Sequence, residues 1–172
     1  MNKIIALSLL QLLFINPLQA SEPVLAMLLT VYSNDMQKFS IGSYGVTCKS
    51  YGVVSLDELM RHANINATCK KSIKNFQRKN PLLNYLSEGL LHVQQLYHID
   101  FRKKSCIIYA KGELTLAEIL LENGLAQVSQ KLSDKYLVYR YKNAQRRAKF
   151  NKKGMFSSRV ATDCLAEFLK VQ

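Results

Sequence analysis

Cationic side chains are the residues of this chain best suited to chemistry, and they are concentrated in its last third. Residues 131–159 include ten lysines and arginines against a single acid, Asp134, and the whole chain carries a formal net charge of +12. A surface of this kind attracts polyanions such as nucleic acid, anionic lipid head groups or acidic cell-wall polymers. The composition therefore predicts a polyanion-binding segment, and the alternative is an ordinary solvated helix face.

A long helix over residues 134–153, ending at Gly154, is predicted to carry these charges. Its apolar residues recur at helical spacing and define the face that packs on the core, namely Leu137, Tyr141, Ala144 and Ala148. The cations on another face are the candidate anion-binding residues: Lys135, Lys142, Arg146, Lys149 and Lys153. Tyr139, on the same helix, is the aromatic residue best suited to stack on a nucleic-acid base. A charged turn at 102–104 is expected to extend this cationic stripe.

The cysteine content favours disulfides over a metal centre. There are four cysteines and no Cys-x-x-Cys pair: Cys48, Cys69, Cys106 and Cys164. In an exported chain an even set of this kind predicts two disulfides, with three pairings left open, and four free thiols are the alternative. The three histidines also lack ligand spacing, so no metal site is predicted.

The N-terminal twenty residues resemble a secretory signal peptide. Lys3 precedes an apolar run from Ile4 to Ile15, and a small-residue exit ends at Ala20. The run is too short for a helix that crosses a bilayer core of roughly 30 Å. We therefore expect an exported protein, periplasmic or secreted, in which residues 21–172 form one domain that does not span the membrane. A retained N-terminal anchor is the alternative.

The remaining patterns predict an α+β domain. Two strands are expected at 24–33 and 36–41, joined by the turn Asn34-Asp35. Capping boxes beginning at Ser55 and Thr115 predict helix starts, and a further helix is expected at 68–80. Residues 91–101 and 105–110 are expected to pair as a hairpin.

The order of the later elements resembles a known family. Tyr109-Ala-Lys-Gly112 leads into the segment 116–126, which ends in Asn-Gly-Leu-Ala, and a basic helix then runs to Lys152-Lys-Gly-Met-Phe-Ser157. This order is similar to the C-terminal half of the thermonuclease (staphylococcal-nuclease-like) family, and the resemblance is best over residues 90–157. It implies an OB-type five-stranded β-barrel with packed helices, followed by a short C-terminal extension at 158–172.

The resemblance also implies where catalytic groups would lie. Active members of the family cut phosphodiester bonds with one calcium ion, two arginines and a glutamate. Lys103 aligns with the second arginine, with Arg102 beside it, so these two are the candidate catalytic residues. Ser40 stands where the first arginine is expected. The catalytic region is thus degenerate, and no cofactor is expected unless the protein is an active nuclease, which would require calcium.

Three acidic residues, at two places in the chain, are the candidates to replace the missing catalytic groups. Asp35 is the only possible counterpart of the metal-binding aspartate in the first hairpin, and Asp57-Glu58 could form a displaced catalytic pair. The alternative for Asp57 and Glu58 is the ordinary preference for acids in a first helical turn.

The predicted function is therefore a thermonuclease-like exported protein that has lost the family's catalysis. It would act as a binding or structural module for nucleic acid or for a protein partner in an envelope assembly. The alternative is an active secreted metal-dependent nuclease that hydrolyses phosphodiester bonds in DNA or RNA. A cluster of acids in the folded protein would favour this alternative.

Overall fold

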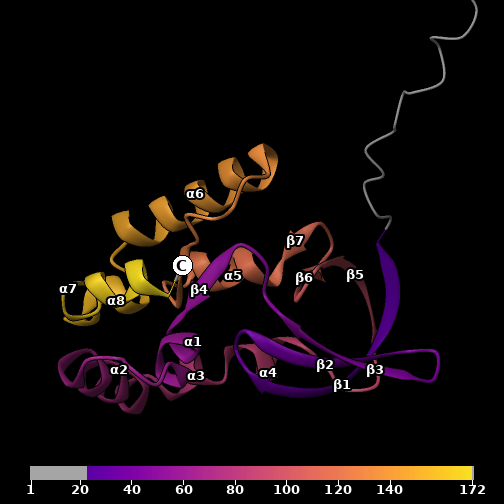
Figure 1. Cartoon of the computed structure of the whole chain (residues 1–172), viewed down its shortest axis with the longest axis horizontal. Coiled ribbons are helices and arrows are strands. Elements are labelled where there is room, and N and C mark those ends of the chain that lie inside the picture. Colours follow the sequence, from indigo (N-terminus) through magenta and orange to yellow (C-terminus); the bar gives the residue numbers. More distant parts are fainter. Residues whose placement is uncertain (1–22, 172) are drawn as a thin grey trace, which may run out of the picture.

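The computed structural model describes residues 23–171 and shows an α+β fold, in which an antiparallel sheet is covered by helices (Figure 1). The strands are β1 (Val24–Ser33), β2 (Met36–Ile41), β3 (Tyr44–Lys49), β4 (Val53–Ser55), β5 (Leu96–Arg102), β6 (Ser105–Lys111), β7 (Leu114–Thr115) and β8 (Ala126–Val128). The helices are α1 (Leu56–Arg61), α2 (Ala67–Lys79), α3 (Pro81–Asn84), α4 (Leu86–Leu90), α5 (Leu116–Glu122), α6 (Lys135–Phe150), the 3₁₀ helix η1 (Gly154–Ser157), α7 (Val160–Asp163) and α8 (Leu165–Lys170).

The long strand β1 organises the main sheet. It pairs antiparallel with β2 on one side and with β5 on the other, and the six strands follow the order β3-β2-β1-β5-β6-β7. Ala26, Leu28 and Phe39 are fully buried on the inner face of this sheet. The strands predicted at 24–33 and 36–41 and the turn between them are confirmed. The predicted strand at 91–101 is shorter, because residues before Leu96 form a turn.

The described strands do not form a closed five-stranded barrel. β3 and β7 are the outer strands of the six-stranded sheet, and β4 pairs with β8 in a separate small sheet. One isolated parallel bridge joins Ser50 to Cys106 of β6, and the Tyr51 amide donates to the Cys106 carbonyl over 2.9 Å. A disulfide between Cys48 and Cys106 lies at the same point. The end of β3 therefore reaches β6 through a single bridge and a covalent link, not through a continuous ladder.

Local capping signals correctly predict several helix starts. The Ser55 hydroxyl accepts from the Glu58 amide over 2.9 Å and begins α1, although the Glu58 side chain turns to Lys49 instead of completing a capping box. At α5 both halves of the box form between Thr115 and Glu118. Asp134 caps α6 by accepting from two amides of its first turn.

The last residues of the chain belong to the same hydrophobic core. α7 packs on α2, and the second disulfide joins Cys69 of α2 to Cys164. Val160 and Phe168 are almost completely buried. The segment 158–171 therefore covers α2 and is covalently attached to it. The predicted signal peptide, 1–20, lies outside the described residues, and within them no helix is long and apolar enough to cross a bilayer.

Candidate polyanion-binding site

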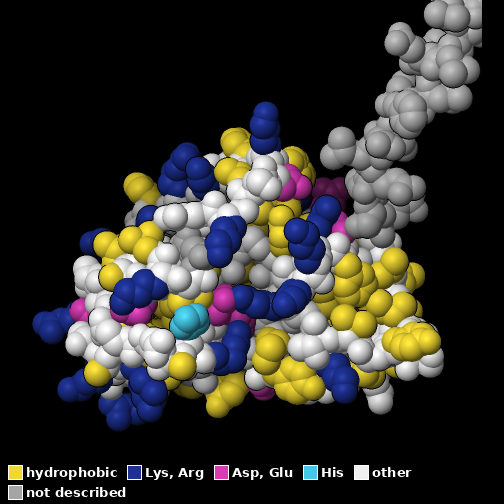
Figure 2. Space-filling view, in the orientation of Figure 1, with side chains coloured by type: hydrophobic (Ala, Val, Ile, Leu, Met, Phe, Trp, Pro, Cys, Tyr) yellow, Lys and Arg dark blue, Asp and Glu magenta, His cyan; other side chains and the backbone are white. Residues whose placement is uncertain are grey.

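α6 lies along one edge of the molecule (Figure 1). The face predicted to be buried is buried: Leu137, Tyr141, Ala144 and Ala148 are each 5% exposed or less. This packing fixes the rotation of the helix, so that residues between these positions must face solvent. Figure 2 shows Lys and Arg side chains gathered over α6 and, at the opposite lower edge, over α2.

Four of the six residues predicted to bind anions line one open groove on α6. The groove has a volume of about 420 Å³ and is lined by Ser133, Lys135, Val138, Tyr139, Lys142, Asn143 and Arg146. We call it the α6 groove. None of its three cations forms an ion pair with a carboxylate of the described residues. Their positive charge is therefore available to an external anion.

Two other cations of α6 are neutralised within the protein. Arg140 donates through Nε and Nη2 to the two oxygens of Glu118, each over 2.7 Å, and Arg147 Nε donates to Glu122 over 3.0 Å. Both acids come from α5, and Glu118 is buried. The segment 131–159 is thus less strongly basic in the fold than in the sequence. No local pattern reveals these pairs, because their acids lie more than twenty residues earlier in the chain.

Tyr139 is well placed for stacking. Its side chain is 69% exposed, lines the α6 groove and has no hydrogen-bond partner among the described residues. Tyr136, one turn earlier, is similarly exposed but is engaged by Arg140, whose guanidinium carbon lies 5.2 Å from the ring centroid. Because of this contact, the ring of Tyr136 is already partly covered, whereas the ring of Tyr139 is open to a ligand. Tyr139 offers an aromatic face between flanking cations, an arrangement that suits an unpaired base.

The structure does not place Lys149 and Lys153 in this groove. Lys149 Nζ lies 5.6 Å from the ring centroid of Phe156 and does not line the groove. Lys153 is not on α6 at all, because the helix ends at Phe150 and Lys152 adopts a positive φ of 50°. The prediction that the helix continues to residue 153 is therefore wrong. The cationic stripe ends about one turn earlier than predicted.

The two candidate catalytic residues lie where β5 ends and its turn to β6 begins. Arg102, at the end of β5, donates through Nη2 to Asp100 over 2.6 Å. Lys103 lies in the turn between β5 and β6 with a φ of 55°, so its side chain projects from a turn and not from a strand. Neither residue forms a hydrogen bond or ion pair with Asp35 or Asp57.

Asp35 and Asp57 do lie close together, but they are occupied by structural contacts. Fully buried Asp35 accepts from Arg61 over 2.7 Å and from the Ser33 hydroxyl over 2.8 Å. Asp57 accepts from the Asn34 amide and from the Gln77 side chain, each over 3.0 Å. Burial raises the pKa of the Asp57 carboxyl, and the nearby charge of Asp35 raises it further. These carboxylates fasten the β1–β2 turn to α1 and α2.

Arg61 belongs to this cluster, but the sequence does not predict its contact with Asp35. Its partner Asp35 lies 26 positions earlier, and no local motif connects them. Among residues 23–171 no group of three or more histidines, cysteines or acids is arranged to hold a metal ion. Among the described residues of this cluster, the acids that do lie close together are thus only two, Asp35 and Asp57, and Arg61 forms an ion pair with the first of them.

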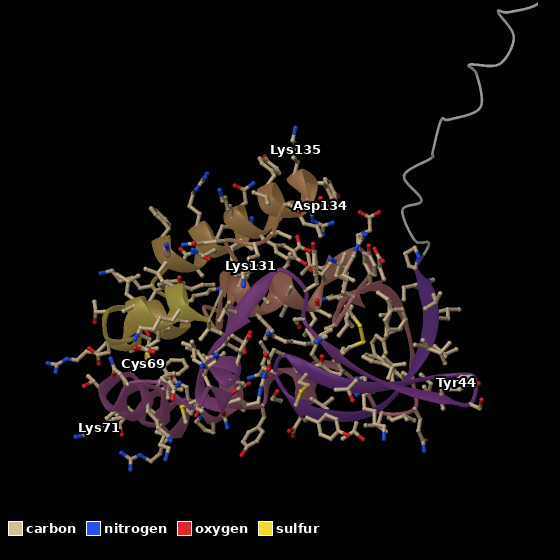
Figure 3. All side chains as sticks on the ribbon, viewed as in Figure 1. Tyr44, Cys69, Lys71, Lys131, Asp134 and Lys135 are labelled. Atoms are coloured by element: carbon tan, nitrogen blue, oxygen red, sulfur yellow. A yellow bond between two sulfur atoms is a disulfide. The ribbon has the colours of Figure 1, made fainter. Side chains whose placement is uncertain are left out.

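A second cationic site lies at the junction of β3, β4 and β6. Lys49, Lys104 and Lys131 line a pocket of about 290 Å³, which we call the lysine pocket. Lys49 forms an ion pair with Glu58, whereas Lys104 and Lys131 have no carboxylate partner among the described residues. Ser50 also lines it and is 3% exposed, and its hydroxyl has no hydrogen-bond partner in the part of the chain that the structure describes. Figure 3 places Lys131 near the middle of the molecule, below α6.

Comparisons with known proteins do not assign the chain to a family. No protein-family model matches the chain, and no characterised protein matches it in sequence.

Proposed function

We propose that this protein is an exported nucleic-acid-binding module with a thermonuclease-like, OB-type fold that lacks the family's catalysis. The α6 groove carries the proposal, because it combines three cations without carboxylate partners and one exposed tyrosine. Cations bind phosphates of any sequence, and an aromatic ring stacks on any base. The expected ligand is therefore single-stranded DNA or RNA, bound with little sequence preference.

Three observations support the other parts of the proposal. β1 pairs with both β2 and β5, and the bridge between Ser50 and Cys106 brings the end of β3 to β6, as an OB-type barrel would require. The two disulfides are typical of exported proteins. Asp35 is already paired with Arg61, which leaves it poorly suited to hold calcium.

Binding of a short fluorescent single strand tests the proposal. The variant Lys135→Gln/Lys142→Gln/Arg146→Gln should bind about 10- to 1000-fold more weakly, and the slope of log K against log salt should fall by about 2 in magnitude. A matched control, Lys38→Gln/Lys111→Gln/Lys170→Gln, loses the same charge outside the groove and should bind nearly as wild type. Equal losses in both variants would show that only net charge matters and would overturn the proposal.

Tyr139 distinguishes a nucleic acid from other polyanions. Tyr139→Ala should weaken single-strand binding about 5- to 150-fold, the range expected for the loss of one stacked base at 1–3 kcal/mol. It should leave the affinity for inorganic polyphosphate unchanged, and Tyr139→Phe should bind both ligands as wild type. Binding of polyphosphate but not of single strands would contradict the assignment to nucleic acid.

Digestion assays test the loss of catalysis separately. DNA and RNA incubated with the oxidised protein should remain intact with calcium, with magnesium and with EDTA. Metal-dependent cleavage that disappears in Lys103→Ala would instead establish the active nuclease and would contradict this part of the proposal.

A further inference from the structure

A second cationic groove lies on α2, which the proposed function does not use. This helix contains five cations and no acid, namely Lys70, Lys71, Lys74, Arg78 and Lys79. Its opposite face is anchored by Cys69, Ile73 and Phe76, all buried, so every one of the cations faces solvent. Four of them line an open groove of about 430 Å³ together with Ala67 and Asn75. We call it the α2 groove.

The charges of the α2 groove are not neutralised by the fold. None of its cations forms an ion pair with a described carboxylate, and Arg78 donates only to the side-chain oxygen of Asn75, over 3.2 Å. Lys70, Lys74 and Arg78 recur every four residues and span about 12 Å at 1.5 Å per residue. A row of cations of this length can follow consecutive phosphates of one strand.

The helix that carries this groove is held firmly in place. The Asn66 side chain caps its first turn by accepting from the Cys69 amide over 2.8 Å. The disulfide to Cys164 fixes it to the C-terminal segment, and α7 packs along it. A positioned row of cations loses less side-chain and backbone entropy on binding than a flexible basic tail would.

The two grooves face different directions. In Figure 3, Lys71 of α2 lies at the lower edge and Lys135 of α6 at the upper edge, with Lys131 between them. Figure 1 shows α1, β4 and α5 between the two helices. A strand bound along one groove therefore leaves the other groove open to a second strand.

We propose that the α2 groove is a second phosphate-backbone site and that the protein bridges two nucleic-acid strands. The inference rests on the proposed function for the α6 groove and extends it from one strand to two. The chemistry at α2 is charge complementarity to a phosphodiester chain, because no exposed aromatic residue lines this groove. Two sites on one rigid body raise the local concentration of the second strand without any contact between strands.

A capture assay tests bridging directly. One single strand is fixed to beads, a fluorescent strand is added in solution, and the fluorescence recruited by the protein is measured. Wild type should recruit the second strand. Lys70→Gln/Lys74→Gln/Arg78→Gln should still bind one strand through the α6 groove but recruit at least about 10-fold less of the second strand. The α6 triple variant should also recruit at least about 10-fold less, in line with its weaker binding of a single strand. Exposed side chains are changed in both variants, so folding should be preserved.

The outcomes separate this inference from the proposed function. A wild-type protein that binds one strand but recruits no second strand would overturn bridging and leave the proposed function intact. Undiminished recruitment by the α2 variant would mean that bridging arises elsewhere, for instance in a dimer, and would also overturn it. Failure of wild type to bind any strand would overturn both. Recruitment of polyphosphate but not of a second nucleic-acid strand would overturn the choice of ligand.

Discussion

At the scale of single residues, neighbouring cations of α6 have different tasks. Arg140 neutralises the buried carboxylate of Glu118, whereas Arg146 faces solvent and has no acidic partner among the described residues. Sequence alone cannot separate them, because both are arginines on one basic helix. The difference depends on α5, which supplies the acid from 22 positions earlier in the chain.

This contrast gives a first prediction. Arg140→Met should lower the free energy of unfolding by about 3 kcal/mol, because it leaves Glu118 buried without its cation. Arg146→Met should change it by less than about 0.5 kcal/mol, as expected at an exposed position. Urea unfolding of the two variants checks the difference. Equal destabilisation would show that the bidentate pair with Glu118 contributes nothing specific to stability.

The partly buried carboxyl of Asp57 predicts an unusual dependence of stability on pH. Its pKa is raised above the ordinary value of 3.8 by burial and by Asp35, so the folded protein holds this proton more tightly than the unfolded chain. The stabilising contribution of Asp57 is therefore fully present below pH 3.8 and is lost as pH rises through the folded pKa.

Asp57→Asn is the variant that isolates this effect. The free energy of unfolding of wild type minus that of the variant should increase as the pH falls from neutral towards about 4. All other titratable groups are present in both proteins, so their contributions to the pH dependence cancel when the two free energies of unfolding are subtracted. Thermal or urea unfolding across this pH range measures it, and parallel curves would refute the prediction.

The residues of the candidate site are partly predictable from the sequence. Lys135, Tyr139, Lys142 and Arg146 follow from helical periodicity alone, because the apolar face of α6 fixes which side is exposed. The placement of Lys153 on the helix is wrong, because α6 ends at Phe150 and Lys152 adopts a positive φ. Ion pairs between distant segments, such as Arg61 with Asp35, leave no local pattern to detect.

At the scale of elements, short-range signals predict helix starts and the first hairpin well. The capping residues Ser55 and Thr115 act within their own first turn, so the sequence contains the whole interaction. The contact between the end of β3 and β6, and the disulfide pairing, depend on segments that are far apart in the chain. The bridge between Ser50 and Cys106 and the pairing of Cys48 with Cys106 therefore emerge only in the fold.

The junction of α5 with η1 illustrates such a long-range constraint. Gly124, with a φ of 66°, packs so closely on the following segment that a Cβ would lie 2.3 Å from the Lys153 carbonyl oxygen. The Met155 amide donates to the Gly124 carbonyl over 2.9 Å, which joins the two segments. The Asn-Gly-Leu-Ala sequence thus ends a helix and also receives the chain that leaves α6.

Alanine substitutions at two glycines test this packing. Gly112 has a similar φ of 58° but no atom within 4 Å of the position that an alanine methyl would occupy, so Gly112→Ala should lower stability by only about 1 kcal/mol. Gly124→Ala adds a backbone clash and should lower it by at least about 3 kcal/mol. Urea unfolding of the two variants measures both values. Similar losses would mean that the η1 segment shifts without resistance.

At the scale of the whole molecule, the two disulfides connect different parts of the fold. Cys48–Cys106 joins β3 to β6 within the sheet and includes no residue of either cationic helix. Cys69–Cys164 joins α2, with its cationic groove, to the C-terminal segment. The second link closes the longer loop, with a sequence separation of 95 against 58. Loss of either link should therefore destabilise the fold, but only the second should affect the α2 groove selectively.

Cys69→Ser/Cys164→Ser should lower the free energy of unfolding by about 4 kcal/mol, because the unfolded chain regains the entropy of a long loop. At a temperature where the variant remains folded, it should still bind one strand through α6, whose contacts with α5 are unchanged. Its recruitment of a second strand should fall, because α2 is no longer held against α7. Cys48→Ser/Cys106→Ser is the matched control and should be destabilised by a similar amount while it keeps both activities. Equal loss of recruitment in both variants would show that bridging depends on overall stability and not on the anchoring of α2.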